Sequence, residues 1–272
     1  MATSWVLKKG MNEMVSVVDI GENLALNFDY GRELVEQYCT NNCQGYHRKW
    51  LERRKSEGPL SAPLITTPFL VSNILTAALL LRERNMRTIR VIIAGIADTK
   101  VLALVNAVFE DVGLYKNSSV EMVTIDACRT PLELCRRFSE GKKFHLVTVH
   151  GSMPDAIGTL CADLVVMSGV LQFMTRDAQR DTLSALTKAI GSDGMIAFGH
   201  SYGQKRAPRE NARFGFEYSS QIKDLILDCG LDIVAEIDGK ISLPVSDGER
   251  RVRSRYSALL KSIDVDPPLT IT

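Results

Sequence analysis

At 272 residues, with 45% hydrophobic and 24% charged residues, the chain has an ordinary globular composition and room for one large α/β domain plus an additional segment. Its net charge of +1 gives no overall field that favours nucleic acid or an anionic membrane, and its longest apolar stretch, 74–81, is far too short to span a bilayer. The six cysteines are scattered, and no apolar signal segment follows residues 1–10. We therefore expect a cytoplasmic protein with reduced thiols, and its oligomeric state, a homo-oligomer included, stays open.

The first 66 residues differ in character from the rest of the chain. Apolar residues recur at helical spacing in 23–42, and an aromatic and basic stretch follows at 43–55. The segment ends in proline and glycine breakers and is too small to bury a core of its own. We expect a helical cap over residues 1–66 on a domain that spans residues 67–272.

From Thr67 to about residue 240, helix and strand patterns alternate. The expected strands are 90–94, 120–125, 145–149, 162–167, 194–199 and 232–237, and after a first helix opened by Thr67-Pro68 the expected helices are 99–112, 130–140, 153–160, 176–190 and 217–229. Residues 240–245 are a candidate further strand, and 250–261 has the pattern of a basic amphipathic helix. The alternation predicts the α/β class, with a Rossmann-like, doubly wound and mainly parallel sheet.

One βαβ unit, over residues 90–138, carries most of the functional information. Its first strand ends at Gly95, where a backbone without a side chain can approach a ligand closely. Its second strand ends at Asp126, where a carboxylate can accept both hydroxyls of a ribose or, alternatively, cap the next helix. Asp98 has a similar pair of interpretations, as a ligand contact or as the cap of the helix after Gly95.

Ligands of open parallel sheets bind beyond the carboxyl ends of the strands, where the strand order reverses. Four strand ends in this chain should therefore surround one crevice: 94–99, 126–129, 150–153 and 168–174. The third of these places Ser152 and Met153 beside an adenine ring, and the fourth holds the reacting end of a cofactor.

The order of elements and the residues at their ends resemble the class I S-adenosylmethionine-dependent methyltransferases over residues 67–240. The resemblance rests on A-G-I-A-D-T (94–99), V-T-I-D-A-C-R-T-P-L-E-L-C (123–135), A-D-L-V-V-M-S-G-V-L-Q-F-M-T-R-D-A-Q-R-D-T-L (162–183) and I-G-S-D-G-M-I-A-F-G-H-S (190–201). The family's G-x-G-x-G loop stands here as Gly95-x-Ala97-x-Thr99, with only its first glycine. The pattern is that of a divergent bacterial branch with a reduced glycine loop.

The resemblance implies S-adenosylmethionine as cofactor and a small molecule as methyl acceptor, since no basic groove for nucleic acid is evident. The residues that it assigns to cofactor binding are Gly95, Ala97, Asp98, Thr99, Asp126, Ala127, Ser152, Met153, Ser168 and Gly169. Two other functions stay open: a non-catalytic binding protein with the same fold, and a nicotinamide-dependent oxidoreductase, which the missing glycines disfavour.

Four residues are candidates for catalysis. His150 and His200 stand near strand ends, where a base is useful, although a histidine there often has a structural role. Tyr46 and His47 belong to a set that either closes over the substrate or packs onto the domain.

The sequence also offers one grouping with the spacing of metal ligands on a helix. Cys39, Cys43 and His47 follow one another at intervals of four, but Gly45 weakens the helix and no fourth ligand is evident. We therefore expect no metal site. Cys128 is expected to be a packed thiol, with a redox role as the alternative.

Overall fold

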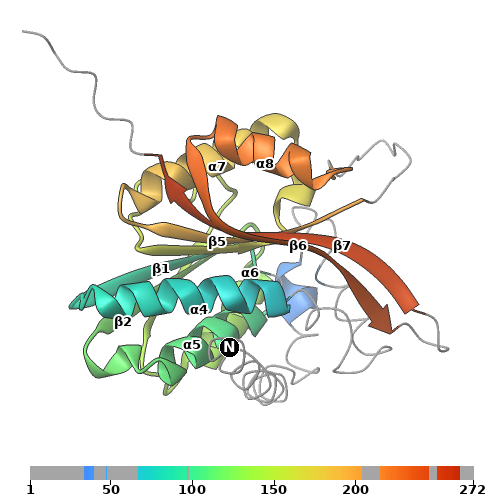
Figure 1. Cartoon of the computed structure of the whole chain (residues 1–272). Helices are drawn as coiled ribbons and strands as arrows, with labels where there is room; N and C mark the ends of the chain where they lie inside the picture. Colours follow the sequence, from blue (N-terminus) through green and yellow to red (C-terminus); the bar gives the residue numbers. More distant parts are fainter. Residues whose placement is uncertain are drawn as a thin grey trace, which may run out of the picture.

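The computed structural model describes residues 34–39, 47, 67–96, 98–203, 215–244 and 250–263 (Figure 1). Its strands are β1 (Thr88–Ala94), β2 (Ser119–Asp126), β3 (His145–His150), β4 (Leu164–Ser168), β5 (Met195–Tyr202), β6 (Leu231–Pro244) and β7 (Arg250–Ser262). Its longer helices are α4 (Thr67–Glu83), α5 (Lys100–Asp111), α6 (Arg129–Ser139), α7 (Arg176–Ile190) and α8 (Ser219–Asp228), with short 3-10 helices η3 (Leu114–Lys116) and η4 (Leu171–Phe173).

The seven strands form one sheet in the order β3-β2-β1-β4-β5-β7-β6. Strands β1 to β5 run parallel, and β7 pairs antiparallel with both β5 and β6. The chain starts in the middle of the sheet at β1, adds β2 and β3 on one side, and then returns to add β4 and β5 on the other. The strand order thus reverses between β1 and β4, and Ala94 at the end of β1 pairs with both Ile125 and Met167.

Helices cover both faces of the sheet, with α7 and α8 above it and α4 and α5 below it in Figure 1. Consecutive residues of β1 point to opposite faces: Val91 and Ile93 pack with the α4, α5 and α6 side, whereas Ile92 and Ala94 pack with the α7 and α8 side. This burial on both faces explains why the inner strands are continuous apolar runs. The fold class predicted from the alternating pattern is confirmed.

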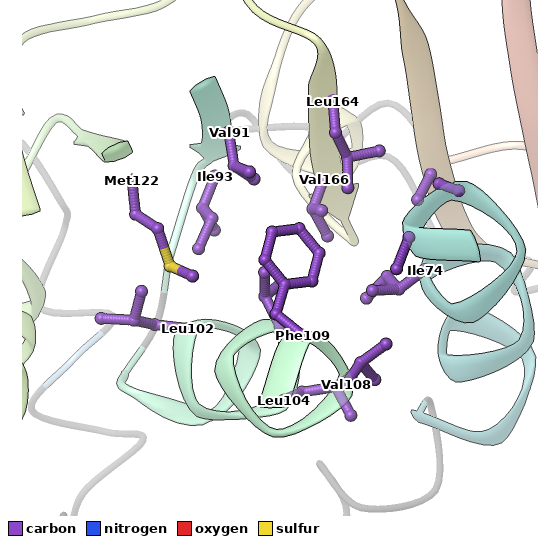
Figure 2. Packing of buried hydrophobic residues seen from close by; sticks show 14 of the residues in the cluster. Ile74, Val91, Ile93, Leu102, Leu104, Val108, Phe109, Met122, Leu164 and Val166 are labelled. Atoms are coloured by element: carbon purple, nitrogen blue, oxygen red, sulfur yellow. The ribbon is translucent and has the colours of Figure 1, made fainter. Parts of the chain in front are cut away.

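Phe109 lies at the centre of the lower layer. Its ring rises from α5 toward Val91 and Ile93 of β1 and Val166 of β4, and the side chain is fully buried (Figure 2). Removing such a ring costs about 3–5 kcal/mol of folding free energy, so this layer fixes the strands whose ends carry the candidate site.

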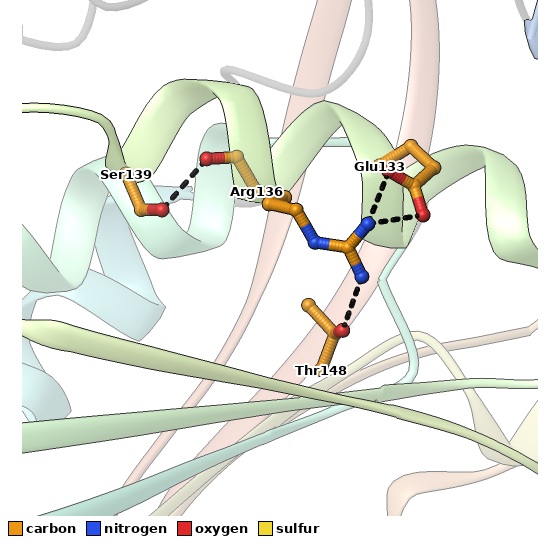
Figure 3. A network of polar contacts seen from close by, with 4 residues as sticks. All are labelled: Glu133, Arg136, Ser139 and Thr148. Atoms are coloured by element: carbon orange, nitrogen blue, oxygen red, sulfur yellow. Dashed lines mark hydrogen bonds and ion pairs between the residues drawn. The ribbon is translucent and has the colours of Figure 1, made fainter.

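The outer part of the same layer is held by polar contacts on the surface. Arg136 of α6 pairs with Glu133 in the same helix at 2.6 Å and donates to the Thr148 hydroxyl of β3 at 3.1 Å (Figure 3). The Ser139 hydroxyl donates to the carbonyl of Arg136 at 2.7 Å. These contacts orient α6 on the edge strand β3.

The expected helix at 250–261 is wrong, because this segment is strand β7. Tyr256, Ala258 and Leu260 belong to the α7 and α8 core, whereas Leu259 between them belongs to the opposite core. Side chains that alternate between two apolar layers have the period of a strand, and pairing with β5 and β6 overrides the basic, helix-like composition. The strand expected at 240–245 is the end of β6, and Val245, the last residue of that expectation, lies outside the described residues.

The expected helix at 153–160 is also wrong. Residues 153–159 form successive turns, with backbone bonds from Ala156 to Ser152 and from Ile157 to Pro154. Pro154 disfavours helical backbone in the residue before it, and Gly158 takes a positive φ of 22°. The place of this segment between two expected strands therefore did not make it a helix.

None of the helices within the described ranges is both long enough and apolar enough to cross a membrane. Of the cap expected over residues 1–66, only 34–39 and 47 belong to the described part of the chain, so the cap stays a prediction.

Candidate functional site

Asp126 ties together the loops that follow β1 and β2. Its Oδ2 accepts a hydrogen bond from the backbone amide of Ile96 at 3.0 Å, and its Oδ1 accepts one from the amide of Cys128 at 2.8 Å. The amide of Gly95 donates to the carbonyl of Ile125 at 2.8 Å. The carboxylate thus stands at the carboxyl edge of the sheet, beside the point where strand order reverses.

The surroundings of Asp126 perturb its ionisation. Burial raises the pKa of its carboxyl to about 7, and the hydrogen bonds from the amides of Cys128 and Ile96 act in the opposite direction. Each carboxylate oxygen keeps a second lone pair beyond the amide that it already accepts. Hydroxyl donors that reached this group would stabilise its charged form.

Gly95 brings three strand ends into contact. Its φ is 70°, in the left-handed region that favours glycine, and a Cβ there would lie 2.4 Å from Val170 Cγ2 and 3.2 Å from Met153 Cε. Val170 follows β4 and Met153 follows β3. The segments after β1, β3 and β4 therefore lie close together at residues 95, 153 and 170, and the crevice expected between them stays a prediction.

The loop after β4 is held by backbone and amide contacts. Gly169 has a φ of 68°, and its amide donates to the carbonyl of Gly199 at 2.8 Å, which continues the pairing of Ser168 with that residue. The side-chain amide nitrogen Nε2 of Gln179, fully buried in α7, donates to the carbonyl of Leu171 at 2.8 Å. Sequence reasoning missed Gln179, although a polar residue at a core position of an amphipathic helix is a usable signal.

Asp98 and Thr99 lie at the start of α5. Asp98 Oδ1 accepts from the backbone amide of Lys100, the first residue of α5, at 2.8 Å, although the N-cap position itself is Thr99, whose side chain makes no cap hydrogen bond. The hydroxyl of Thr99 is buried, and no hydrogen-bond partner for it occurs among the described residues. Ala97 lies outside the described residues.

His150, the last residue of β3, and Ser152, on the loop after it, are both exposed. The Nε2 of His150 lies 3.1 Å from the carbonyl of Ala127, and His150 pairs in register with Asp126. The Ser152 hydroxyl donates to Asp155 at 3.3 Å. These residues therefore stand at the same edge as Asp126.

His200 lies elsewhere, in the packed layer between the sheet and the α7 and α8 side. Its ring stacks on Phe198 and meets the ring of Phe216 edge-on, with centroids 6.2 Å and 5.0 Å away. Its Nδ1 lies 2.5 Å from the carbonyl of Ser201. Burial lowers the pKa of His200 to about 4, partly opposed by that bond, so the ring is neutral at pH 7.

The described part of the N-terminal segment contacts the loops after β1 and β2. The Cys128 thiol donates to the carbonyl of Tyr38 at 3.8 Å, and the Thr130 hydroxyl donates to the carbonyl of Leu34 at 3.2 Å. His47 is buried and hydrogen-bonds the backbone of Ile96; burial lowers its pKa to about 4, against the opposing effect of that bond. Tyr46 lies outside the described residues.

Comparison with known proteins gives similarity in structure but not in sequence. No protein-family model matches the chain, and no curated protein sequence matches it. The carbon methyltransferase CurJ superimposes with a TM-score of 0.50 at 12% identity, covering 79% of this chain and 58% of CurJ. TehB from Haemophilus influenzae gives 0.49 at 11% identity, covering 70% of this chain and 62% of TehB.

The N-methyltransferase NodS from Bradyrhizobium japonicum, solved with S-adenosyl-L-homocysteine, gives a TM-score of 0.43 at 15% identity, covering 69% of this chain and 85% of NodS. This chain spans less than two thirds of the length of CurJ and of TehB. The described sheet has seven strands, of which β7 runs antiparallel to its neighbours. This sheet and the superposition on CurJ together establish the architecture. The chain has the Rossmann-like fold of the class I S-adenosylmethionine-dependent methyltransferases.

Proposed function

We propose that this protein transfers a methyl group from S-adenosylmethionine to a small-molecule acceptor. The observation that carries the proposal is the position of Asp126: a carboxylate at the end of β2, bonded to the loop after β1, next to Gly95 and to the reversal of strand order. Ligands of open α/β sheets bind at this place. The fold shared with CurJ, a carbon methyltransferase, favours methyl transfer among the functions that such sheets support.

The proposed cofactor contacts follow the edge from one strand end to the next. Asp126 holds the two ribose hydroxyls, and Gly95 lets the backbone approach the cofactor. The remaining contacts are Ala97, Asp98 and Thr99 at the methionine end, Ala127, Ser152 and Met153 around the adenine, and Ser168 and Gly169 at the reacting centre.

The residues present fit such a cofactor in two respects. The oxygens of Asp126 retain lone pairs that ribose hydroxyls can use, and these bonds would be charge-assisted. The buried hydroxyl of Thr99 has no partner among the described residues, so a polar cofactor group that reached it would remove an unfavourable unsatisfied donor.

A sulfonium cofactor supplies a methyl group that is already activated. The protein then has to align the acceptor with it and exclude water, and it needs a base only when the acceptor arrives protonated. Among the candidate bases His150 is exposed at the same edge as Asp126, whereas His47 and His200 are buried and neutral at pH 7. His150 is therefore the first residue to test for proton transfer.

A specific observation favours a second candidate, a non-catalytic protein with this fold. The side chains of Val170 and Met153 fill the space over Gly95, and both oxygens of Asp126 already accept backbone amides. The third candidate, a nicotinamide-dependent oxidoreductase, is disfavoured because a pyrophosphate needs more of the glycine loop than Gly95 alone.

Isothermal titration calorimetry of the full chain separates the three candidates. Saturable binding of S-adenosylmethionine and S-adenosylhomocysteine, without binding of NAD, supports the methyltransferase. Binding of NAD alone supports the oxidoreductase. Absence of binding by all three ligands to folded protein contradicts the proposal and supports the non-catalytic candidate.

A further inference from the structure

Three potential metal ligands meet where the N-terminal segment contacts the sheet edge. Within the described residues, the ligand atoms of Cys39, His47 and Cys128 all lie within 4.8 Å of one another. All three side chains are buried, with exposed fractions of 8%, 4% and 3%. Two of them come from the N-terminal segment and the third from the loop after β2, so the cluster exists only in the folded chain.

The donor atoms select the kind of metal. Two thiolates and an imidazole suit Zn²⁺, whereas Mg²⁺ and Ca²⁺ require oxygen ligands. Zinc–sulfur and zinc–nitrogen bonds of about 2.3 and 2.0 Å in a tetrahedron place the two sulfurs and the nitrogen roughly 3.5–3.8 Å apart. The observed separations of up to 4.8 Å therefore need to shorten by roughly 1.0–1.3 Å at most, which side-chain rotation supplies.

The charge balance suits a buried site. Zn²⁺ with two thiolates and one neutral imidazole has no net charge, so its burial avoids the large cost of an unbalanced ion. In the thiol form Cys128 donates its proton to the carbonyl of Tyr38. Metal binding would release that proton and the proton of Cys39 to solvent, and each sulfur would then bond to the metal.

Neighbouring backbone groups already orient two of the three ligands. The His47 ring hydrogen-bonds the backbone of Ile96, and this bond favours the charged form of the ring, so the ring is the donor. A ligating histidine commonly donates from its other nitrogen to a carbonyl in this way, which fixes the tautomer. The amide of Cys128 donates to Asp126, which fixes the loop that carries the thiol.

We propose that Cys39, His47 and Cys128 bind a Zn²⁺ ion that fastens the N-terminal segment to the loops after β1 and β2. Three protein ligands leave one coordination position for water or another donor. The grouping weighed from sequence joined Cys39 and His47 with Cys43, which lies outside the described residues; the structure supplies Cys128 instead. The expectation of no metal site is thereby replaced.

The test measures metal in the full chain, which is purified with reductant, given Zn²⁺ at a defined ratio and then dialysed against metal-free buffer. Elemental analysis by mass spectrometry should find roughly one Zn²⁺ ion per chain. Replacing Zn²⁺ with Co²⁺ should give the ligand-field and thiolate charge-transfer bands of a tetrahedral site with sulfur ligands. The Co²⁺ spectrum needs no variant, so it keeps the test valid if a substitution impairs folding.

Cys39→Ser, Cys128→Ser and His47→Gln should each lower the bound zinc at least roughly tenfold at limiting Zn²⁺. Cys229→Ser is the matched control: Cys229 is also 8% exposed and its thiol also donates to a backbone carbonyl, that of Arg180, but it stands outside the cluster. It should bind as much zinc as the unmodified chain.

Three results would overturn the proposal: absence of zinc and of cobalt bands in folded protein, equal zinc content in all four variants, or a Cys39–Cys128 disulfide in peptides mapped without reductant. Metal content is read without any cofactor or acceptor. A failure here therefore leaves the proposed methyl transfer untouched, and the converse also holds.

Discussion

The two sides of the carboxyl edge are built differently. On the β1 and β2 side, polar bonds dominate: Asp126 accepts two backbone amides, and the N-terminal segment packs onto Ile96 and Cys128. On the β4 side the contact is apolar, and Val170 fills the space over Gly95. In the proposed function, the polar side supplies the charge and hydrogen bonds for the cofactor, and the apolar side keeps water away from it.

The largest expected effect concerns the apolar side. Gly95→Ala adds a methyl group 2.4 Å from Val170 at a φ of 70°, and overpacking plus left-handed strain should lower the free energy of unfolding by about 2–5 kcal/mol. Gly141→Ala has a φ of 73° with no atom within 4 Å, so it should cost only about 1–2 kcal/mol. Urea unfolding measures both values.

The double variant Gly95→Ala with Val170→Ala isolates the steric part of that cost. Since the second change removes the Val170 methyl groups that the new Cβ at position 95 would meet, the two changes should be less destabilising together than the sum of their separate effects. If the two changes in unfolding free energy simply add, a side chain at position 95 does not meet Val170.

The polar side is tested by Asp126→Ala, which removes the proposed ribose acceptor and leaves the amides of Ile96 and Cys128 without it. Calorimetry should show a loss of S-adenosylhomocysteine affinity of at least roughly 100-fold, or about 2.7 kcal/mol.

Asp163→Ala is the control, because Asp163 accepts the amide of Arg90 at 2.7 Å at the opposite end of β1. It should destabilise the fold to a similar degree without weakening binding; unchanged affinity in Asp126→Ala would refute the ribose assignment.

The burial of His200 between the sheet and the α7 and α8 side predicts that folding stability depends on pH. Its folded pKa of about 4 lies below the unfolded value of 6.5, so the unfolded chain binds more protons between these values. This contribution to stability is therefore present above pH 6.5 and is lost as the pH falls toward 4. In the unmodified chain it should amount to about 2 kcal/mol between roughly pH 7 and pH 5.

His200→Gln should remove that part of the pH dependence, measured by urea unfolding across the same range. His145→Gln is the control, because the side chain of His145 is 73% exposed. If the free energy of unfolding falls equally toward pH 5 in His200→Gln and in the unmodified chain, the His200 ring is accessible to solvent and the predicted contribution is absent.

The smallest effect is expected away from the carboxyl edge of the sheet, at the contacts of Arg136 with Glu133 and Thr148 in Figure 3. Arg136→Ala should change the free energy of unfolding by less than about 1 kcal/mol, since its side chain is 59% exposed and solvent screens the pair with Glu133. It should leave S-adenosylhomocysteine affinity unchanged. A larger loss of unfolding free energy, or any loss of S-adenosylhomocysteine affinity, would mean that the position of α6 controls the loop that carries Cys128.

The fold was predictable because its signals are local and periodic. The strand expected at 90–94 and the helix expected at 176–190 correspond to β1 and α7, whose apolar patterns match their burial. Residues 250–262 were not predictable in this way, because Tyr256 and Leu259 owe their strand conformation to pairing with β5 and β6. Composition alone favoured a helix there.

The candidate site was predictable only in part, for a related reason. Gly95 and Asp126 could be placed together, since parallel strands bring their ends to one edge. The meeting of His47 with Cys128 depends on how the N-terminal segment folds back over that edge, and no spacing in the sequence encodes such a contact. The burial of His200 depended likewise on the packing of Phe198 and Phe216 around it.

In the proposed function, both sides of the carboxyl edge form one site for S-adenosylmethionine. Hydrogen exchange of the full chain with and without saturating S-adenosylhomocysteine tests it directly, with peptides resolved by mass spectrometry. We expect slower exchange in peptides that contain Ile96, Cys128 and Gly169, and unchanged exchange in those from α8. Protection confined to other parts of the chain, or none at all at saturating ligand, would contradict it.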